Sequence, residues 1–338
     1  MKNQINYKHI IGIDISKMHL DLCLTHNNKP IYQARITNSH QGFKVLEKKL
    51  KSLKIKLDQV MFCCENTGIY NHVLLDFIQK KQAHLWLENA LTIKKSLGLT
   101  RGKSDEEDAK RIATYAFRYQ DKYKPWQPPT ESIVQLTKLW RRRRRLVKQQ
   151  TQIQQYLTDV KAMEGKSAYM EEKRGYQITL SAIKKNIKQV EQGLKNILAS
   201  DKELDHLRKI ITSVDGVGWL TAIYLILVTE GFKRLNDPRK LACYAGVAPY
   251  PYRSGSSVKG RDSISPFANK ELKKMLHLCA VSLLRMQNSF TDFVARKKKE
   301  GKHMLSILNS LRNKILHVVC ACVRKNVMYT KNYVNSLG

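Results

Sequence analysis

The sequence predicts a mixed α/β domain followed by an all-α remainder. Extended apolar segments that alternate with helical patterns are confined to about the first ninety residues. The stretch 130–200 contains no proline and three glycines, which is typical of long helices. The last third has helix-capping residues and apolar residues at helical spacing. We therefore expect a first domain over 1–129, a helical coiled-coil segment over 130–199 and a helical C-terminal domain over 200–338.

The first domain is predicted to contain a mixed sheet. Between 7 and 37, an apolar run ending at Asp14, the alternating run "HLDLCLTH" and the run "PIYQARI" predict a three-stranded meander. After a helical stretch over 42–53, "QVMFCCENTG" predicts a buried strand that ends at Glu65. The amphipathic "IYNHVLLDFIQKK" and the short strand "AHLWLEN" follow. Strands and helices that alternate in this way predict an α/β layer.

The rest of the chain is predicted to be helical. The run "LWRRRRRLVKQQTQIQQYL" belongs to one of two long helices that pair as a hairpin or coiled coil, with a break near "MEGKSAY". The pattern "SDKE" from Ser200 indicates a capping box that opens a new helix. The segment "NDPRKLACYAG" has an Asp cap, an early Pro and a final Gly. A last helix is expected over 303–324.

Charge and composition indicate a nucleic-acid partner. The chain has 61 Lys and Arg against 28 Asp and Glu, a formal net charge of +33. No apolar run reaches the roughly 20 residues that cross a bilayer, and no signal peptide is visible at the start. We therefore expect a cytoplasmic protein without membrane contact. The seven cysteines show no zinc-ligand spacing and are expected to be reduced core residues.

Four carboxylates are candidates for a metal site. Asp14 and Glu65 end two predicted strands, and Asp105 and Asp108 share one face at the head of a predicted helix. Carboxylates at one edge of a sheet repel one another, and Mg²⁺ or Mn²⁺ relieves that repulsion. Two such ions about 4 Å apart would support in-line displacement at phosphorus. Taken singly, each residue is more often an ordinary acid than a metal ligand, and Asp105 and Asp108 fit helix N-terminal acids.

Three further motifs are candidates for contacts with phosphate. The "DGVGWLTA" turn resembles a helix-hairpin-helix, in which the N–H groups of Gly216 and Gly218 hold a phosphate, although a plain tight turn fits as well. In "YRSGSSVKG", cations surround a hydroxyl, although a flexible linker is the ordinary interpretation. A run of five arginines would neutralise phosphates unless it is only a solvated helix surface. The residues of the last two motifs are Ser254, Arg253, Lys259 and Arg261, and Arg141, Arg142, Arg143, Arg144 and Arg145.

Four blocks resemble a known family. "GIDISK", "ENTGIY" and "KSDEEDAKRIATYA" are similar to the three blocks of the DEDD transposases of insertion sequence family 110. The stretch from "AGVAPYPYRSGSSVKG" to "ISPFANKELKKMLHLCA" is similar to their C-terminal transposase block. The resemblance implies a RuvC-like, RNase H-like first domain. It also matches the four family acids to Asp14, Glu65, Asp105 and Asp108, and Glu106 and Glu107 between them point elsewhere.

The resemblance also implies a mechanism and partners. A serine in the C-terminal block becomes linked to a DNA end, and the serine before glycine is Ser254 here, with Ser256 and Ser257 as rivals. Because no histidine lies in this loop to act as a base, a metal ion from the acid cluster would activate the hydroxyl in a composite site. The implied partners are DNA, a structured guide RNA from the element and further copies of this chain in a dimer or tetramer. A nucleoid-associated bacterial protein is expected.

The expected function is therefore a DNA recombinase that acts through a phosphoserine link with metal-bound carboxylates. A hydrolytic, RuvC-like nuclease specific for DNA structure is the alternative, because the acid cluster alone serves both. A non-catalytic RNA-binding protein is a third class. An actin-like kinase also begins with "GID" and a hairpin, but it needs Gly-rich phosphate loops of a kind that this sequence does not offer.

Overall fold

Two units, divided between Pro128 and Pro129, make up the chain. The computed structural model describes residues 6–96, 105–250, 253–254, 258–259, 264, 268–285 and 287–330. At Asp105 and in the pairs 253–254 and 258–259 it describes the backbone alone. Each unit has a hydrophobic core of its own. The further boundary at 199/200 stays a prediction.

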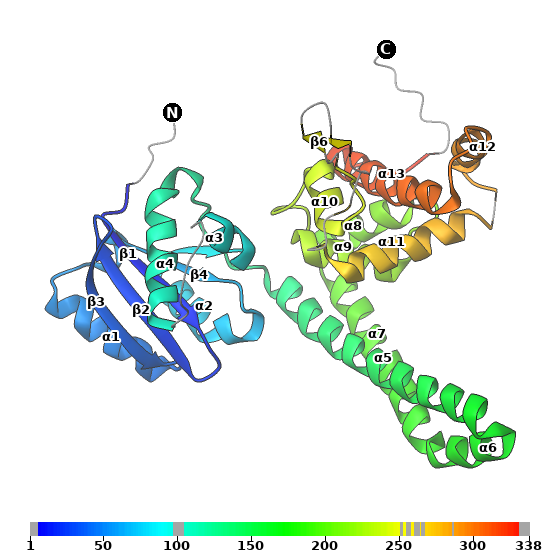
Figure 1. Ribbon diagram of the computed structural model, residues 1–338, viewed down its shortest axis with the longest axis horizontal. Helices are drawn as coiled ribbons and strands as arrows, with labels where there is room; N and C mark the ends of the chain where they lie inside the picture. Colours follow the sequence, from blue (N-terminus) through cyan, green and yellow to red (C-terminus); the bar gives the residue numbers. More distant parts are fainter. Residues whose placement is uncertain are drawn as a thin grey trace. The chain divides into compact units, whose positions relative to one another are not determined.

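The first unit is built on a five-stranded mixed sheet (Figure 1). The strands are β1 (His9–Ile15), β2 (His19–His26), β3 (Lys29–Thr37), β4 (Val60–Glu65) and β5 (His84–Glu88). Their order is β3-β2-β1-β4-β5, with β1, β4 and β5 parallel and β2 and β3 antiparallel to their neighbours. The predicted meander and the two later strands are confirmed, and this order fits an RNase H-like fold.

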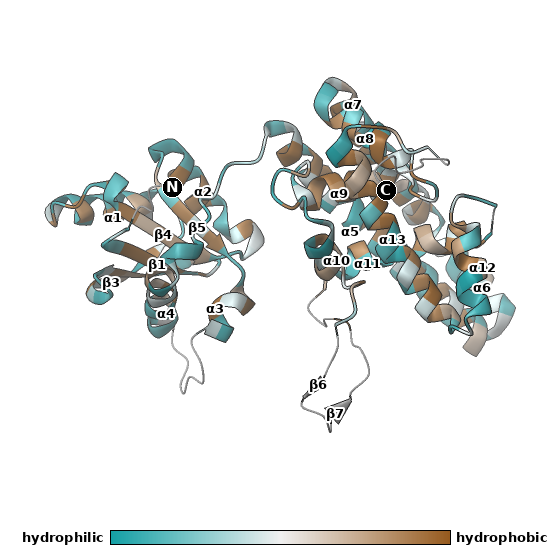
Figure 2. Ribbon diagram, turned by 90° about the horizontal axis from the view of Figure 1, so that it is seen from above, coloured by the Kyte–Doolittle hydropathy of each residue, from teal (hydrophilic) through white to brown (hydrophobic). Residues whose placement is uncertain are grey.

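Helices cover both faces of this sheet. They are α1 (His40–Ser52), α2 (His72–Lys81), α3 (Ala90–Ser96) and α4 (Asp105–Arg118). Since successive side chains of a strand point to opposite faces, Ile11 and Ile13 join a core with α1 and α2. Ile10 joins a second core with α3 and α4. In Figure 2 the strands are mainly brown, or hydrophobic, and the helices carry teal, hydrophilic segments.

Two long helices open the second unit. Helix α5 (Glu131–Met163) packs against α7 (Gln177–Ser200), and α6 (Gly165–Gly175) lies between them in the chain. The predicted break is confirmed at Glu164, where α5 ends and Gly165 has the left-handed φ of 92°. Helix α6 was not predicted as a separate element. The name coiled coil stays a prediction, because pairing of two helices does not by itself establish a heptad repeat.

Helix α9 (Trp219–Thr229) has buried residues on successive faces, among them Ala222, Ile223, Leu225 and Ile226. Helices α8 (Lys202–Thr212) and α11 (Lys270–Leu283) pack against it. The other helices are α10 (Pro238–Ala245), α12 (Thr291–Lys299) and α13 (Met304–Lys325), and α13 packs on the other two and on α8 and α11. The capped helix α10 is confirmed, since Asp237 accepts from its first amides and Gly246 ends it. Prediction of the Ser200 capping box is wrong. The cap is Asp201, which accepts from the Leu204 N–H at 3.1 Å.

Six of the seven cysteines are buried, as expected, but Cys243 on α10 is exposed. All seven are free thiols. Burial raises the pKa of Cys64 to about 12, so this thiol stays protonated and unreactive at neutral pH. Within the described parts of the chain, no helix has both the length and the apolar character that a membrane crossing requires.

Candidate active site

The sheet edge where β1, β4 and β5 end gathers acidic residues on one face. Counting by twos from Ile10 on β1 leads to Asp14, and from Met61 on β4 to Glu65. The same step from Trp86 on β5 leads to Glu88. Ile10, Met61 and Trp86 all belong to the core beneath α4. The three acids therefore lie on the face that α4 covers.

Gly12 sets how closely α4 approaches this face. A Cβ built at Gly12 would collide with the backbone of α4 at Ala109 O and Ala113 N. Ala109 and Ala113 are completely buried, so small residues on both sides allow the helix backbone to lie directly on β1. Because Asp108 precedes Ala109 and Asp14 lies two residues beyond Gly12, this contact brings the head of α4 to the acidic end of β1.

Glu65 interacts electrostatically with two of the other predicted acids. Burial raises the pKa of Glu65, and the negative charges of Asp14 and Asp108 raise it further. Carboxylates from β1, β4 and α4 thus repel one another across this edge, as expected for groups that share a cation. Asp108 also pairs with Arg111 on the next turn of α4, at 2.8 Å from Arg111 Nη1 to Asp108 Oδ1.

Repulsion at Glu65 gives a prediction for stability. Because its pKa in the folded protein is raised above the ordinary 4.5, the ionised form opposes folding above the raised pKa. Below the unfolded value both states are protonated and the effect vanishes. Glu65→Gln should therefore raise the Tm in EDTA at neutral pH. At about pH 4 it should leave the Tm unchanged. The rise should be small, about 1–2 °C, because water screens a half-buried carboxylate.

Calorimetry of Glu65→Gln and of Glu106→Gln checks this expectation. Glu106 is exposed on α4, so its replacement should leave the Tm unchanged at both pH values. A lower Tm for Glu65→Gln at neutral pH would show that the ionised carboxylate is stabilised by a partner, and would contradict the repulsion.

The described side chains do not form a complete metal-binding site. Within them, no group of three or more His, Cys, Asp or Glu residues lies close enough to hold a metal ion. The backbone of Asp105 opens α4, as predicted, but its side chain lies outside the described residues. The structure thus brings Asp14, Glu65 and Asp108 into electrostatic reach, and the four-carboxylate metal site stays a prediction.

Glu88 is an acid at this edge that was not predicted. It pairs in register with Glu65 on the neighbouring strand. Its Oε2 accepts from the Tyr115 hydroxyl at 3.2 Å, and its Oε1 accepts from the Asn89 N–H at 2.7 Å. Tyr115 belongs to α4, so Glu88 ties this helix to β5. A sequence signal was present, since "HLWLE" ends in an acid just as "VMFCCE" does.

The serine segment forms a two-stranded antiparallel ribbon. Strand β6 (Arg253–Ser254) pairs with β7 (Val258–Lys259), with Ser254 opposite Val258 and Arg253 opposite Lys259. The backbone therefore places the two basic residues opposite each other, with Ser254 and Val258 as the neighbouring pair. Their side chains, and the predicted residues Ser256, Ser257 and Arg261, lie outside the described residues.

Two family models match the sequence in the order expected from its motifs. A DEDD transposase model of IS110 elements matches residues 11–160, which contain all four predicted acids. The transposase model of the IS116/IS110/IS902 family matches residues 208–295, which contain Ser254. The chain belongs to the IS110 family of transposases. It is accordingly a transposase of the DNA-recombining class, and the predicted resemblance is confirmed.

Two relatives align with nearly the whole of the transposase. The pilin gene-inverting proteins of Moraxella lacunata and Moraxella bovis are each 28% identical to it over 335 residues. Each alignment covers 96% of this chain and 98% of the relative. An uncharacterized 43.6 kDa protein of insertion element IS110 from Streptomyces coelicolor is 28% identical over 127 residues, which are 38% of this chain and 31% of that protein.

The five arginines of the transposase's α5 have different surroundings. Arg143 Nε donates to Glu191 Oε1 on α7 at 2.7 Å, and its guanidinium lies over the Trp140 ring. Arg144 lies 3.4 Å from Glu271 on α11. Arg141, Arg142 and Arg145 are exposed, and the described residues include no carboxylate paired with them. Only these three are free to meet phosphate without first breaking an ion pair.

This difference predicts how nucleic-acid affinity depends on salt. Changing Arg141, Arg142 and Arg145 to Gln should flatten the slope of log K against log salt by about 0.9 for each duplex phosphate that the variant no longer neutralises. Arg143→Gln is the matched control. It removes one positive charge from the same helix, but a charge already held by Glu191, so the slope should stay as it is. An unchanged slope in the triple variant would mean that the run is only a solvated surface.

The Gly-x-Gly turn of the transposase has a structural use. Gly216 has a left-handed φ of 79°, and a Cβ there would press on the Leu283 side chain of α11. Gly218 is the N-cap of α9. Burial raises the pKa of Cys279, while hydrogen bonds from Thr221 and from the Gly218 backbone lower it. The Gly218 N–H is thus engaged inside the protein, and phosphate binding at the two glycines stays a prediction.

Proposed function

We propose that this transposase cuts and rejoins DNA through a covalent phosphoserine intermediate formed by Ser254. The acids Asp14, Glu65, Asp105 and Asp108 bind divalent cations in the same reaction. The observation that supports this proposal most directly is the rise in the pKa of Glu65 caused by Asp14 and Asp108, carboxylates of two other elements. Mutual repulsion of this kind marks groups that gain from a shared cation.

The donor set suits a hard cation. All four predicted ligands are carboxylates, the groups that Mg²⁺ and Mn²⁺ prefer. Bound there, such a cation would stabilise negative charge on the attacking and leaving oxygens. Arg111 holds Asp108 by an ion pair, so cation binding has to compete with this guanidinium. Arg111 thereby keeps part of the acidic edge neutralised before metal binds.

A phosphoserine link retains the free energy of the broken phosphodiester bond, which hydrolysis would release. Ser254 Oγ gives up its proton and forms a bond to phosphorus, while the bond from phosphorus to one sugar oxygen breaks and that oxygen takes up a proton. Attack by a sugar hydroxyl on the phosphoserine reverses the step and joins a new strand. Arg253 and Lys259, placed opposite each other by the β6–β7 register, would balance charge on the phosphate.

The target DNA sequence would be recognised by base pairing rather than by protein side chains. A net charge of +33 suits contacts with phosphate backbones, which carry no sequence information. We propose that a structured guide RNA of the element pairs with donor and target DNA and is held by these cations. Ser254 and the carboxylates must act on one phosphate, and a dimer or tetramer on DNA would let different copies of the chain supply them.

Denaturing electrophoresis of labelled DNA distinguishes the proposed recombinase from a hydrolytic nuclease. After incubation with the protein, guide RNA and Mg²⁺, a covalent intermediate gives a protein-linked DNA band that survives denaturant. A hydrolase gives free cut strands alone. Cut DNA without any linked band, in a short time course that would catch an intermediate, would overturn the phosphoserine route and favour a RuvC-like nuclease.

A further inference from the structure

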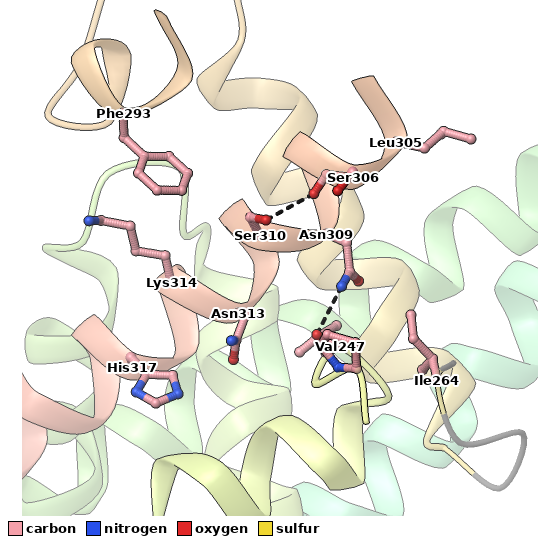
Figure 3. Close-up of a pocket in the computed structure, with 11 residues that line it drawn as sticks. Val247, Ile264, Phe293, Leu305, Ser306, Asn309, Ser310, Asn313, Lys314 and His317 are labelled. Carbon is pink, nitrogen blue, oxygen red and sulfur yellow. Dashed lines mark hydrogen bonds between the residues drawn. The ribbon is translucent and has the colours of Figure 1, made fainter. Parts of the chain in front are cut away.

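A pocket of about 740 Å³ lies along α13 in the second unit (Figure 3). It is formed by one face of α13, by Phe293 of α12 and by residues on either side of the serine segment. Val247 and Pro249 precede that segment and Ile264 follows it. Its volume is within the range of pockets that hold small organic ligands, about 300–1,000 Å³.

The α13 wall of the pocket is polar. Ser306, Ser310, Asn313 and His317 recur at helical spacing and line it, while Leu311 and Ile315 between them are buried in the core. The Ser310 hydroxyl donates to Ser306 O, so its lone pairs remain available. A stripe of hydroxyl, amide and imidazole groups opposite a hydrophobic core face presents both donors and acceptors to the pocket.

Two of these polar groups lack partners. Asn309 Nδ2 donates to Val247 O at 3.0 Å, which leaves its Oδ1 buried without a hydrogen bond among the described residues. Asn313 Oδ1 is likewise buried and has no hydrogen bond among the described residues. Buried acceptors of this kind are nearly always satisfied in native proteins. Two unsatisfied acceptors at one pocket wall are compatible with a ligand that brings N–H donors to this wall.

The rest of the pocket is apolar and basic. Val247, Pro249, Ile264 and Phe293 supply flat or apolar surface. Lys314 Nζ lies 4.7 Å from the centroid of the Phe293 ring, at the same wall as Asn313. None of the residues found to line the pocket is acidic. A ligand that fits these walls would be planar or apolar on its faces, would carry donors and acceptors at its edge, and would have negative charge near Lys314.

We propose that this pocket holds one unpaired nucleotide of the strand being exchanged. Its base would lie against the apolar wall with its edge on Asn309 and Asn313, and its phosphate at Lys314. This inference rests on the proposed function, because strand exchange requires bases near the cut to leave their original pairing. Val247, Pro249 and Ile264 line the pocket and flank the segment that carries Ser254. The residues that would contact the base are therefore next to the serine segment in the sequence.

Binding to short oligonucleotides in EDTA, where no cutting occurs, tests the pocket. Full-length protein is titrated with a single-stranded DNA oligonucleotide, the same sequence as RNA, and the blunt DNA duplex. Asn313→Leu should weaken single-strand binding about tenfold, since loss of a hydrogen bond to a base edge costs about that much, and should leave duplex binding within about twofold. The DNA and RNA arms show which strand supplies the nucleotide. Lys314→Gln provides a second variant should the leucine disturb packing.

Arg324→Gln is the matched control for Lys314→Gln. It removes one exposed positive charge from the same helix outside the pocket, so any weakening should affect single strands and duplex alike. Unchanged single-strand affinity in both pocket variants would overturn the proposal, as would an equal loss on single strands and duplex. The assay involves no cleavage. Absence of a protein-linked band would therefore refute the phosphoserine route while leaving this result standing.

Discussion

Ser254→Ala should abolish the protein-linked DNA band while folding and nucleic-acid affinity remain at wild-type values. The physical reason is that one oxygen atom is the proposed nucleophile, and alanine has no atom that can form the phosphodiester. A hydroxyl on a short two-stranded ribbon contributes little to stability, typically within about 0.5 kcal/mol. Denaturing electrophoresis after incubation with DNA, guide RNA and Mg²⁺ measures the band, and circular dichroism checks the fold.

Ser256→Ala and Ser257→Ala are the matched controls for this loss. Each removes one hydroxyl from the same segment and should keep the band. If Ser254→Ala retains the band and one of these two loses it, the nucleophile has been placed two or three residues too early. If all three variants retain it, the nucleophile lies elsewhere in the chain.

Removing one carboxylate from the acidic edge has an effect of similar size on cleavage. Asp14→Asn, Glu65→Gln, Asp105→Asn or Asp108→Asn should each lower the cleavage rate by more than about a hundredfold, since even changes to the residues that surround metal ligands cost about 10–100-fold. Nucleic-acid affinity should stay the same or rise, because each change removes a negative charge that repels phosphate. A time course with labelled DNA in Mg²⁺ measures the rate, and filter binding in EDTA measures the affinity.

Glu106→Gln and Glu107→Gln are controls in the same turn of α4. Glu106 is exposed, and Glu107 pairs with Lys110 at 3.7 Å, so both changes should leave cleavage nearly intact. They also test the assignment of Asp105, whose side chain lies outside the described residues, and that of Asp108. Full cleavage in two of the four acid variants would refute the metal site. A large loss in Glu106→Gln would move the ligand one residue from Asp105, and a large loss in Glu107→Gln would move it one residue from Asp108.

Much of the first unit could be predicted because its signals are local. Alternation along "HLDLCLTH" and the turn after it define the hairpin, and the apolar runs that end in Asp14 and Glu65 define two parallel strands. The expectation that Asp108 lies near these acids comes from its place at the head of a predicted helix and from the family resemblance. How closely Asp108 approaches them depends on the contact between Gly12 and the backbone of α4. Hydrophobic patterns do not predict this contact, because glycine has no side chain that contributes to them.

The missed features depend on contacts between distant residues. Glu88 lies beside Glu65 through strand register, and Arg143 is held by Glu191 through the packing of α5 on α7. Ser200 and Asp201 are both good cap residues, and the choice falls to Asp201 because α7 continues through Ser200. The pocket on α13 joins residues more than fifty positions apart. Local patterns carry no information about any of these pairings.

Because one thiol is exposed and six are buried, the copies of this chain in an assembly can be counted with a thiol-reactive label. Cys243 is the one exposed cysteine of the seven, and the other six are buried. A maleimide fluorophore at neutral pH should therefore attach once per chain, on α10, with no engineered residue. When single DNA molecules with bound protein are illuminated, each bleaching step then corresponds to one chain. The number of copies in a working assembly can be read directly from the wild-type protein.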